Sequence, residues 1–374
     1  MNISTVKQCT GIVSSSLEGP SAIASRFKRV QPFVALVILI GTAVLIGYGL
    51  LRGQEALSVR GDKSGKDVHL YQAIVKRLHS GESYYVVAGE ELRARGYATR
   101  PFVNWRPPFL AWFLAALPNP TWGRLILLSI ASMAWAMWVI LFYKAGDHRR
   151  TIAVAMLLSV FFPTAYLEVS SYFHEFWAGM IILFTLALYA NNHWRLAVLT
   201  GSAALLLREI SLPFVLVMLG CAVWERRWSE VVCWVFGLTA FALFLIIHAS
   251  IVTPLLSEAD RTNVWVRWGG WRFVLATAGW NPWLILFDFK WIVAVMFPLA
   301  LVGLAGWRGR LGYRVALTVI AYILVFMLVG RQDNAYWGML YAPLVTFGWM
   351  MAPAAFYDLW TAARRIRHPQ LLTD

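Results

Sequence analysis

Residues 32–51 decide the fold class, and they read PFVALVILIGTAVLIGYGLL. A helix needs about 20 predominantly apolar residues to cross the hydrocarbon core of a bilayer, and this run is that long. It is too long for the hydrophobic part of a signal peptide, so it predicts an uncleaved first membrane span. The basic residues Arg26, Lys28 and Arg29 precede the run, and we predict that the tail before it lies in the cytoplasm.

Further apolar runs follow the first one. They occupy residues 122–143, 151–166, 174–190, 196–207, 211–224, 229–253, 291–306, 313–330 and 337–360. The sequence therefore predicts an all-α polytopic membrane protein of about ten transmembrane helices, with residues 1–374 as a single transmembrane domain. Lys or Arg occurs in every connection predicted to be cytoplasmic, which favours both termini inside. Arg208-Glu209 and Pro213 interrupt the stretch 196–224, so we predict two short helices that meet at a turn there.

The composition supports a membrane protein. Hydrophobic residues make up 59% of the 374 residues and charged residues 14%, against about 45–50% and 25% in soluble domains. These values exclude a disordered chain, a collagen-like chain and an ordinary soluble enzyme. The net charge of +14 is interpreted as basic residues at helix ends that face anionic membrane lipids, so we expect no nucleic-acid partner.

Two long polar segments are predicted to be outer loops, residues 52–118 and 254–290. In the first loop, apolar residues recur at helical spacing at Tyr71, Ile74, Val75 and Leu78. This stripe predicts an amphipathic helix on the membrane surface, beginning near Asp67 and ending at Gly81. The apolar segment 107–117 is too short to cross a bilayer, so we expect a re-entrant or interfacial helix.

Asp67 has a structural and a functional interpretation. Ser64-x-x-Asp67 matches a capping box, in which the acidic side chain would only stabilise the start of a helix. A carboxylate in a large polar loop can equally take a proton from a substrate hydroxyl. The spacing alone favours the capping role.

Short motifs after the first span carry a resemblance. Asp67, Tyr71 and Ala73 approach an Asp-x3-Tyr-x2-Ala pattern with the alanine one position early, and a Gly and a Tyr follow about fourteen and eighteen residues after the aspartate. Asn104-Trp-Arg106-Pro-Pro then opens the short apolar segment before the second span. This order of elements resembles the GT-C class, polytopic glycosyltransferases that use polyprenyl-phosphate sugars.

The resemblance implies an inverting transfer of a sugar from a polyprenyl-phosphate donor to a glycan, lipid or protein acceptor. Asp67 would be the general base, with Asp62 as its rival. The leaving phosphate needs positive charge, for which Arg208 is the first candidate and Arg106 and Arg331 are the second. Arg208 has a structural alternative, an ion pair with a neighbouring glutamate. Compact loops and the absence of a retention tail suggest a bacterial inner membrane, with the site facing the periplasm.

Other polar and aromatic residues are candidates for substrate contacts. They are Tyr71, Glu168, His174, Glu175, Glu209, Trp268 and Trp271. The turn 168–175 could orient a sugar, hold a divalent metal or cap helices, and the tryptophans could anchor the loop in the membrane instead of stacking on the acceptor or the lipid carrier. Residues 331–337 would add a further polar edge to the same outer cavity. We expect neither metal nor cofactor, because a monophosphate donor needs little charge neutralisation.

Two rival functions remain open. One is a lipid-carrier transporter or flippase, and the other is a glycan ligase or polymerase that uses polyprenyl-diphosphate glycans. Few charges lie inside the predicted spans and no inverted repeat occurs, which argues against the transporter. The longest loop follows the first span instead of lying late in the chain, which argues against the ligase. No phosphate-binding GxxxxGK[ST] or dinucleotide-binding GxGxxG motif is found.

Overall fold

The computed structural model describes residues 25–52, 62–263, 266–287, 289–330 and 332–365, and these ranges contain helices and no β-strand. The longer helices are α2 (Pro32–Arg52), α4 (Asp62–His79), α5 (Tyr84–Ala94), α7 (Pro120–Lys144), α8 (His148–Ser159), α10 (His174–Ala190), α11 (Trp194–Leu207), α12 (Leu212–Trp224), α13 (Trp228–Val252), α16 (Lys290–Gly306), α17 (Gly309–Leu328) and α18 (Ala342–Arg364). The shorter ones are η1 (Arg26–Arg29), η2 (Phe102–Asn104), α6 (Phe109–Ala115), α9 (Phe161–Tyr166), η3 (Glu168–Tyr172), η4 (Glu209–Ser211), η5 (Thr253–Leu255), α14 (Gly270–Ala278), α15 (Pro282–Phe287) and η6 (Gln332–Leu340). The all-α prediction is confirmed for these residues.

The helices differ in whether they can cross a membrane. Within the described ranges, four are long and apolar enough: α2, α7, α17, and α13 continued to Leu255. A fifth span results if η6 and α18, which are bent by 63°, count as one. Helices α10, α11, α12 and α16 are apolar but shorter than about 20 residues. These helices support a membrane protein, whereas the number of ten spans and the inside location of the termini stay predictions.

Two predicted helix boundaries can be compared with the structure. A break at Arg208-Glu209 separates α11 from α12, as predicted. The far ends of the two helices return to each other, since the Arg227 guanidinium carbon lies 5.9 Å from the centre of the Trp194 ring. The run 151–166, predicted as one helix, is divided into α8 and α9. Pro163 lacks the amide hydrogen that a continuous helix would need there.

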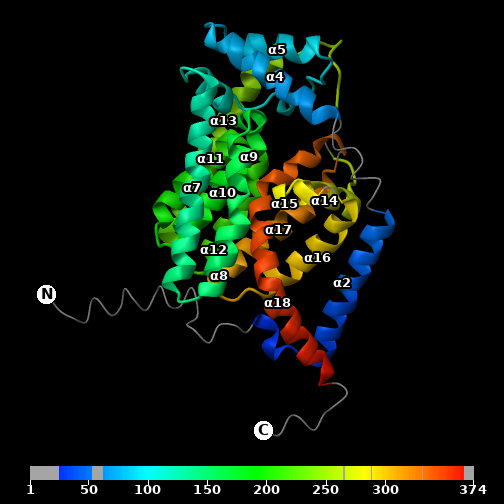
Figure 1. Ribbon diagram of the computed structural model, residues 1–374. Coiled ribbons are helices and arrows are strands. Elements are labelled where there is room, and N and C mark those ends of the chain that lie inside the picture. Colours follow the sequence, from blue (N-terminus) through cyan, green and yellow to red (C-terminus); the bar gives the residue numbers. More distant parts are fainter. Residues whose placement is uncertain (1–24, 53–61, 264–265, 288, 331, 366–374) are drawn as a thin grey trace, which may run out of the picture.

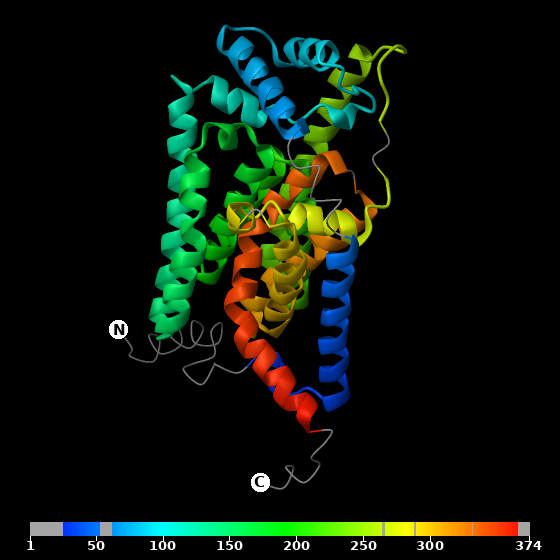
Figure 2. The same ribbon diagram turned by 45° about the vertical axis from the view of Figure 1, so that its right-hand side comes forward.

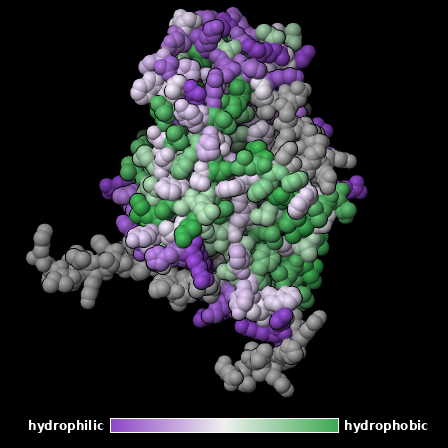
Figure 3. Space-filling view, viewed as in Figure 1, coloured by the Kyte–Doolittle hydropathy of each residue, from purple (hydrophilic) through white to green (hydrophobic). Residues whose placement is uncertain are grey.

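The first predicted loop folds into a cap, residues 62–115, over one end of the remaining helices, the body (Figure 1). Helix α2 rises toward the cap, while η1 and the end of α18 lie at the opposite end (Figure 2). Hydrophilic side chains gather over the cap and apolar ones over the body (Figure 3). The cap therefore resembles a water-exposed lid on a lipid-exposed bundle.

Helix α4 differs from its prediction in two ways. It begins at Asp62, so Asp67 lies in the second turn and the capping-box interpretation is wrong. The apolar stripe is covered by protein, because Ile74 is buried in a small core with Val87 of α5 and Ala111 of α6, and the rest of the stripe is partly buried against that core. The stripe is thus not left for a membrane surface. The predicted end at Gly81 is confirmed, since this residue has a φ of +93° that glycine adopts without strain.

Helix α10 forms the centre of the body. Nearly all of its residues are buried, and it packs against α7, α11, η6 and α18. A helix that is apolar on every face is expected in such a position. Gly179 allows α10 to approach η6 closely, because a Cβ atom at this position would overlap the backbone carbonyl oxygen of Met339. This approach fixes the start of α10 beside η6, where the candidate site lies.

Replacing Gly179 by alanine is therefore expected to destabilise the protein. Forcing atoms into a packed interior costs about 1–3 kcal/mol, which outweighs the roughly 1 kcal/mol that alanine contributes over glycine in a helix. Thermal denaturation in detergent would measure the loss. Gly41→Ala in α2 is the matched control, because a Cβ atom there meets no atom within 4 Å. Equal stability of the two variants would contradict the close packing.

Candidate active site

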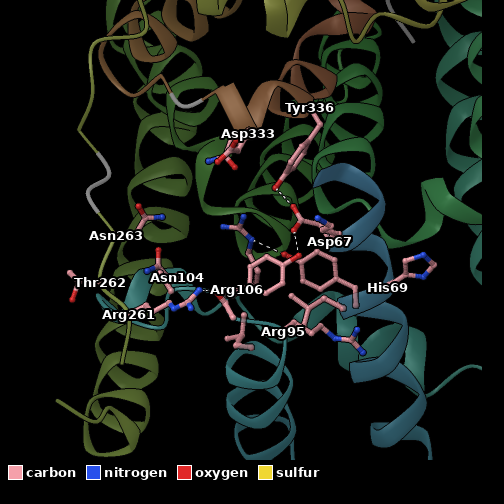
Figure 4. Close-up of a pocket in the computed structure, with 18 residues that line it drawn as sticks. Asp67, His69, Arg95, Asn104, Arg106, Arg261, Thr262, Asn263, Asp333 and Tyr336 are labelled. Carbon is pink, nitrogen blue, oxygen red and sulfur yellow. Dashed lines mark hydrogen bonds between the residues drawn. The ribbon is translucent and has the colours of Figure 1, made fainter. Parts of the chain in front are cut away.

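A polar cavity of ≈ 500 Å³ lies between the cap and the body. Five parts of the chain line it: α4, the end of α5 with the residues that follow, residues 104–106, residues 261–263, and η6 (Figure 4). The side chains that matter for chemistry are Lys66, Asp67, His69, Tyr71, Arg95, Tyr97, Asn104, Arg106, Arg261, Asn263, Asp333, Asn334 and Tyr336. Three of the candidates, Asp67, Tyr71 and Arg106, thus lie in one cavity. The polar edge predicted at 331–337 also joins it.

Asp67 is held by two tyrosines. The Tyr97 hydroxyl donates to its Oδ1 at 2.6 Å, and the Tyr336 hydroxyl donates to its Oδ2 at 2.8 Å. Burial raises the pKa of Asp67 above its usual value, while the two hydroxyl groups oppose that rise by stabilising the carboxylate. The result is a carboxyl group with a fixed orientation and an increased affinity for a proton, which suits a general base.

A chain of polar contacts runs from the cavity into the body. Arg106 Nε donates to the Tyr71 hydroxyl oxygen at 3.1 Å, and its Nη1 donates to Glu209 Oε1 at 3.3 Å. The same Glu209 oxygen also accepts from Arg208 Nη1. Arg208 Nε in turn donates to Glu175 Oε1 at 2.7 Å. Glu209 therefore links the arginine that lines the cavity to the arginine behind it.

Arg208 itself is fully buried and is not among the residues that line the cavity. Its guanidinium lies 5.7 Å from the centre of the Trp337 ring, and Glu175 beside it is only 2% exposed. Charges this deeply buried need partners, because an unpaired one loses its hydration without compensation. The ion pairs predicted as the structural alternative for Arg208 are therefore present. Of Arg106 and Arg208, only Arg106 lines the cavity and can touch a ligand there.

His174 lies behind Tyr71 and is not among the residues that line the cavity. Its ring packs edge-on against the Tyr71 ring, with 4.6 Å between the centroids. The side chain is 3% exposed, and its Nδ1 has no hydrogen-bond partner among the described residues. Tyr71 is thus fixed from one side by His174 and from the other by Arg106.

Local helix geometry explains this arrangement. Asp67, Tyr71 and Ile74 lie at positions i, i+4 and i+7 of α4, so they share one face. Glu175 lies in the first turn of α10, where the helix dipole favours a negative charge. A kink at Asn334 interrupts η6. Tyr336 then points toward Asp67 (Figure 4).

Residues 256–263 follow η5 alongside the cap, and residues 261–263 among them line the cavity. The Arg100 amide donates to the Arg261 carbonyl at 3.2 Å, and the Asn263 amide donates to the Arg100 carbonyl at 2.9 Å. Arg93 of α5 forms an ion pair with Asp260 at 2.9 Å. This segment is therefore attached to the cap at several points.

Several sequence candidates lie elsewhere. Glu168 is exposed and accepts a hydrogen bond from Gln72 at 3.4 Å, outside the cavity. Trp268 precedes α14 instead of lying on its face, and its side chain is 68% exposed. Trp271 packs on Phe297 in the body. Neither tryptophan lines the cavity, so their predicted substrate contacts gain no support. Arg331 and the side chain of Asp62 lie outside the described residues.

Sequence reasoning missed part of the cavity. Tyr97, Arg95, Arg261 and Asn263 carried no motif, and their contacts join residues far apart in the chain. The Tyr97 hydroxyl meets Asp67 across 30 positions, and Arg261 Nη1 meets the Gly96 carbonyl across 165. Arg95 lies in the first predicted loop and Arg261 in the second, and no sequence pattern placed the two in one cavity.

The arrangement can take a proton and hold a negative charge in one partly enclosed space. Within the described ranges, no group of three or more His, Cys, Asp or Glu side chains is placed to hold a metal ion; the expectation of a metal-free site stays a prediction. The site therefore has to be interpreted from its own residues. Comparisons with protein families, with curated proteins and with solved structures find no match for this chain.

Proposed function

We propose that this protein is an inverting glycosyltransferase that moves a sugar from a polyprenyl-phosphate donor to an acceptor hydroxyl. The observation that carries the proposal is the position of Asp67, an oriented carboxyl group in a cavity that it shares with Arg106. The apolar body beside the cavity suits a lipid-linked donor. By the charge pattern of the connections, the cap would lie on the periplasmic face of a bacterial inner membrane.

In the proposed step, the acceptor oxygen forms a bond to the anomeric carbon of the sugar. The bond from that carbon to the phosphate oxygen breaks, and its electrons leave with the polyprenyl phosphate. The hydroxyl proton passes to Asp67. Phosphate is a good leaving group, so a single base is sufficient and the main further need is positive charge near the phosphate.

Arg106 is the residue best placed to supply that charge. Its side chain is 13% exposed and lines the cavity, whereas Arg208 lies behind it. Through Glu209, Arg208 would position Arg106 and not contact the phosphate itself. Tyr71 would fix the same guanidinium from the cap side.

A donor panel tests the proposal directly. Purified full-length protein in nanodiscs is incubated with short-chain polyprenyl-phosphate sugars, and released polyprenyl phosphate is measured with a membrane extract as acceptor source. Release from one donor supports the proposal and identifies the sugar. Release only from a diphosphate-linked glycan would favour a ligase or polymerase instead. Movement of intact donor across the bilayer, without release, would favour a flippase.

The pH dependence of transfer provides a second test. Asp67 must be ionised to act as a base, so activity is lost as the pH falls through its pKa. Tyr97→Phe removes a hydrogen bond to the carboxylate and should raise this pKa further. The acidic limb of the kcat/KM profile is expected to move to higher pH by about one to two units, because a hydrogen bond to a charged group contributes about 1.5–3 kcal/mol.

Tyr85→Phe is the matched control for this change. Its hydroxyl also belongs to the cap but contacts His248 Nδ1 at 3.1 Å and not Asp67. The acidic limb of the kcat/KM profile of Tyr85→Phe should stay at the wild-type pH. A limb that moves equally in both variants, or moves to lower pH in Tyr97→Phe, would contradict the role of Asp67.

A further inference from the structure

The cap side of the cavity carries more positive charge than a neutral acceptor would require. Lys66, Arg95 and Arg261 line the cavity in addition to Arg106, whereas the described lining contains two carboxylates, Asp67 and Asp333. Like charges gathered in a concave site concentrate the field and attract ligands of opposite sign.

The two arginines on this side are only partly engaged by carboxylates. Arg95 Nε and Nη2 both donate to one oxygen of Glu91, and the Arg95 side chain is 38% exposed. Arg261 Nη1 donates to the neutral carbonyl oxygen of Gly96 at 3.0 Å. The carboxylate next to Arg261 in the chain, Asp260, is bound by Arg93 instead. Arg261 thus keeps its charge at the cavity wall.

The position of these arginines separates them from the proposed leaving group. In Figure 4, Arg95 and Arg261 lie toward the cap and Tyr336 lies toward the body, with Asp67 and Arg106 between them. An inverting displacement requires the attacking oxygen and the leaving phosphate on opposite sides of the anomeric carbon. If Arg106 holds the leaving phosphate, cations farther out on the cap side face the other reactant.

We propose, on the basis of the glycosyltransferase function above, that Arg95 and Arg261 form an acceptor subsite for a molecule that bears a phosphate group close to the hydroxyl that reacts. Lys66 adds a third positive charge to the lining of the same cavity. Forked guanidinium groups bind phosphate through paired charge-assisted hydrogen bonds. A phosphomonoester offers three terminal oxygens to such a group of cations, and a phosphodiester offers two. The phosphate can belong to a lipid head group or to a soluble sugar phosphate.

Acceptor discrimination tests this proposal. Three acceptors with the same sugar are compared using full-length protein in nanodiscs: a neutral alkyl glycoside, a glycoside joined to an alkyl chain through a phosphodiester, and the soluble sugar phosphate. The measured quantity is kcat/KM for each phosphate-bearing acceptor divided by kcat/KM for the neutral one. In Arg95→Gln/Arg261→Gln this ratio is expected to fall about tenfold, as for the loss of charge-assisted hydrogen bonds to a partly exposed phosphate.

Arg195→Gln is the control, because it removes one exposed arginine at the start of α11, at the other end of the body. Its ratio should equal that of the wild type. An unchanged kcat/KM ratio in Arg95→Gln/Arg261→Gln overturns the proposal. A double variant whose only change is a higher KM for the donor also overturns it. A preference for the phosphodiester over the soluble phosphate identifies a lipid head group, and the reverse identifies a soluble acceptor.

If the double variant does not fold, Arg95→Lys/Arg261→Lys is measured instead. It retains the positive charges but loses the forked guanidinium groups, and its kcat/KM ratio should fall by less than tenfold.

Equilibrium binding separates this proposal from the glycosyltransferase function. The phosphodiester glycoside is titrated into wild type and the double variant, without donor. Binding that weakens about tenfold in the variant, in a protein that releases no polyprenyl phosphate from any donor, retains the phosphate subsite and overturns the transferase. Release of polyprenyl phosphate that depends on Asp67, with equal binding of the phosphodiester glycoside to both proteins, retains the transferase and overturns the phosphate subsite.

Discussion

Asp67→Asn is expected to lower kcat/KM for sugar transfer by about 100- to 10,000-fold while the protein stays folded. A positioned general base typically contributes this much to a reaction. Asparagine has the same shape as aspartate, and its amide oxygen can still accept one of the two tyrosine hydroxyl bonds. It has no carboxylate to receive the acceptor proton, so chemistry should suffer far more than stability. Polyprenyl phosphate release and the thermal denaturation midpoint would be measured on the same preparation.

Two further variants make the assignment specific. Asp62→Asn changes the rival aspartate at the start of α4, and Glu258→Gln changes an exposed carboxylate outside the cavity. Both should retain transfer within a few-fold of the wild type. Full turnover in Asp67→Asn would remove it as the base. Loss of turnover in Asp62→Asn alone would transfer that role to Asp62.

The helices were predictable from sequence because their causes are local. An apolar run that must satisfy its backbone groups in lipid has to be helical, and every predicted run is helical over most of its length, although 151–166 and 337–360 are each divided between two helices. The break at Arg208-Glu209 was predictable for the same reason, since two adjacent charged side chains and a nearby proline disfavour a continuous apolar helix. Spacing likewise placed Asp67 and Tyr71 on one face of α4.

Tertiary contacts were not predictable by these arguments. The stripe of α4 was expected to face a membrane, but a buried apolar face has the same periodicity whether lipid or protein covers it. Trp268 and Trp271 are three positions apart, as on a helical face, yet α14 begins between them at Gly270. Tyr97 and Arg261 reach the cavity only because the cap and residues 256–263 fold together.

The second large effect is expected from Arg208→Met, and it concerns stability. This substitution leaves Glu175 buried without its guanidinium partner, and it leaves the partly buried Glu209 with Arg106 as its remaining partner. Breaking a buried ion pair by removing one partner costs about 3–5 kcal/mol, because the remaining charge keeps its desolvation penalty. Thermal denaturation in detergent should show a lower midpoint, and binding of the donor should weaken as Arg106 loses its support through Glu209.

A compensating variant distinguishes a structural arginine from one that binds phosphate. In Arg208→Met/Glu175→Gln, a neutral amide replaces the unpaired buried carboxylate of Glu175, so part of the lost stability should return. If Arg208 affects donor binding only through the buried ion pair that stabilises this region, donor affinity should recover in part together with stability. If Arg208 contacts the phosphate directly, stability should recover while donor affinity remains as low as in Arg208→Met. Normal stability together with a loss of donor binding in Arg208→Met would contradict the ion-pair role, because the protein would then fold without a partner for the buried glutamate.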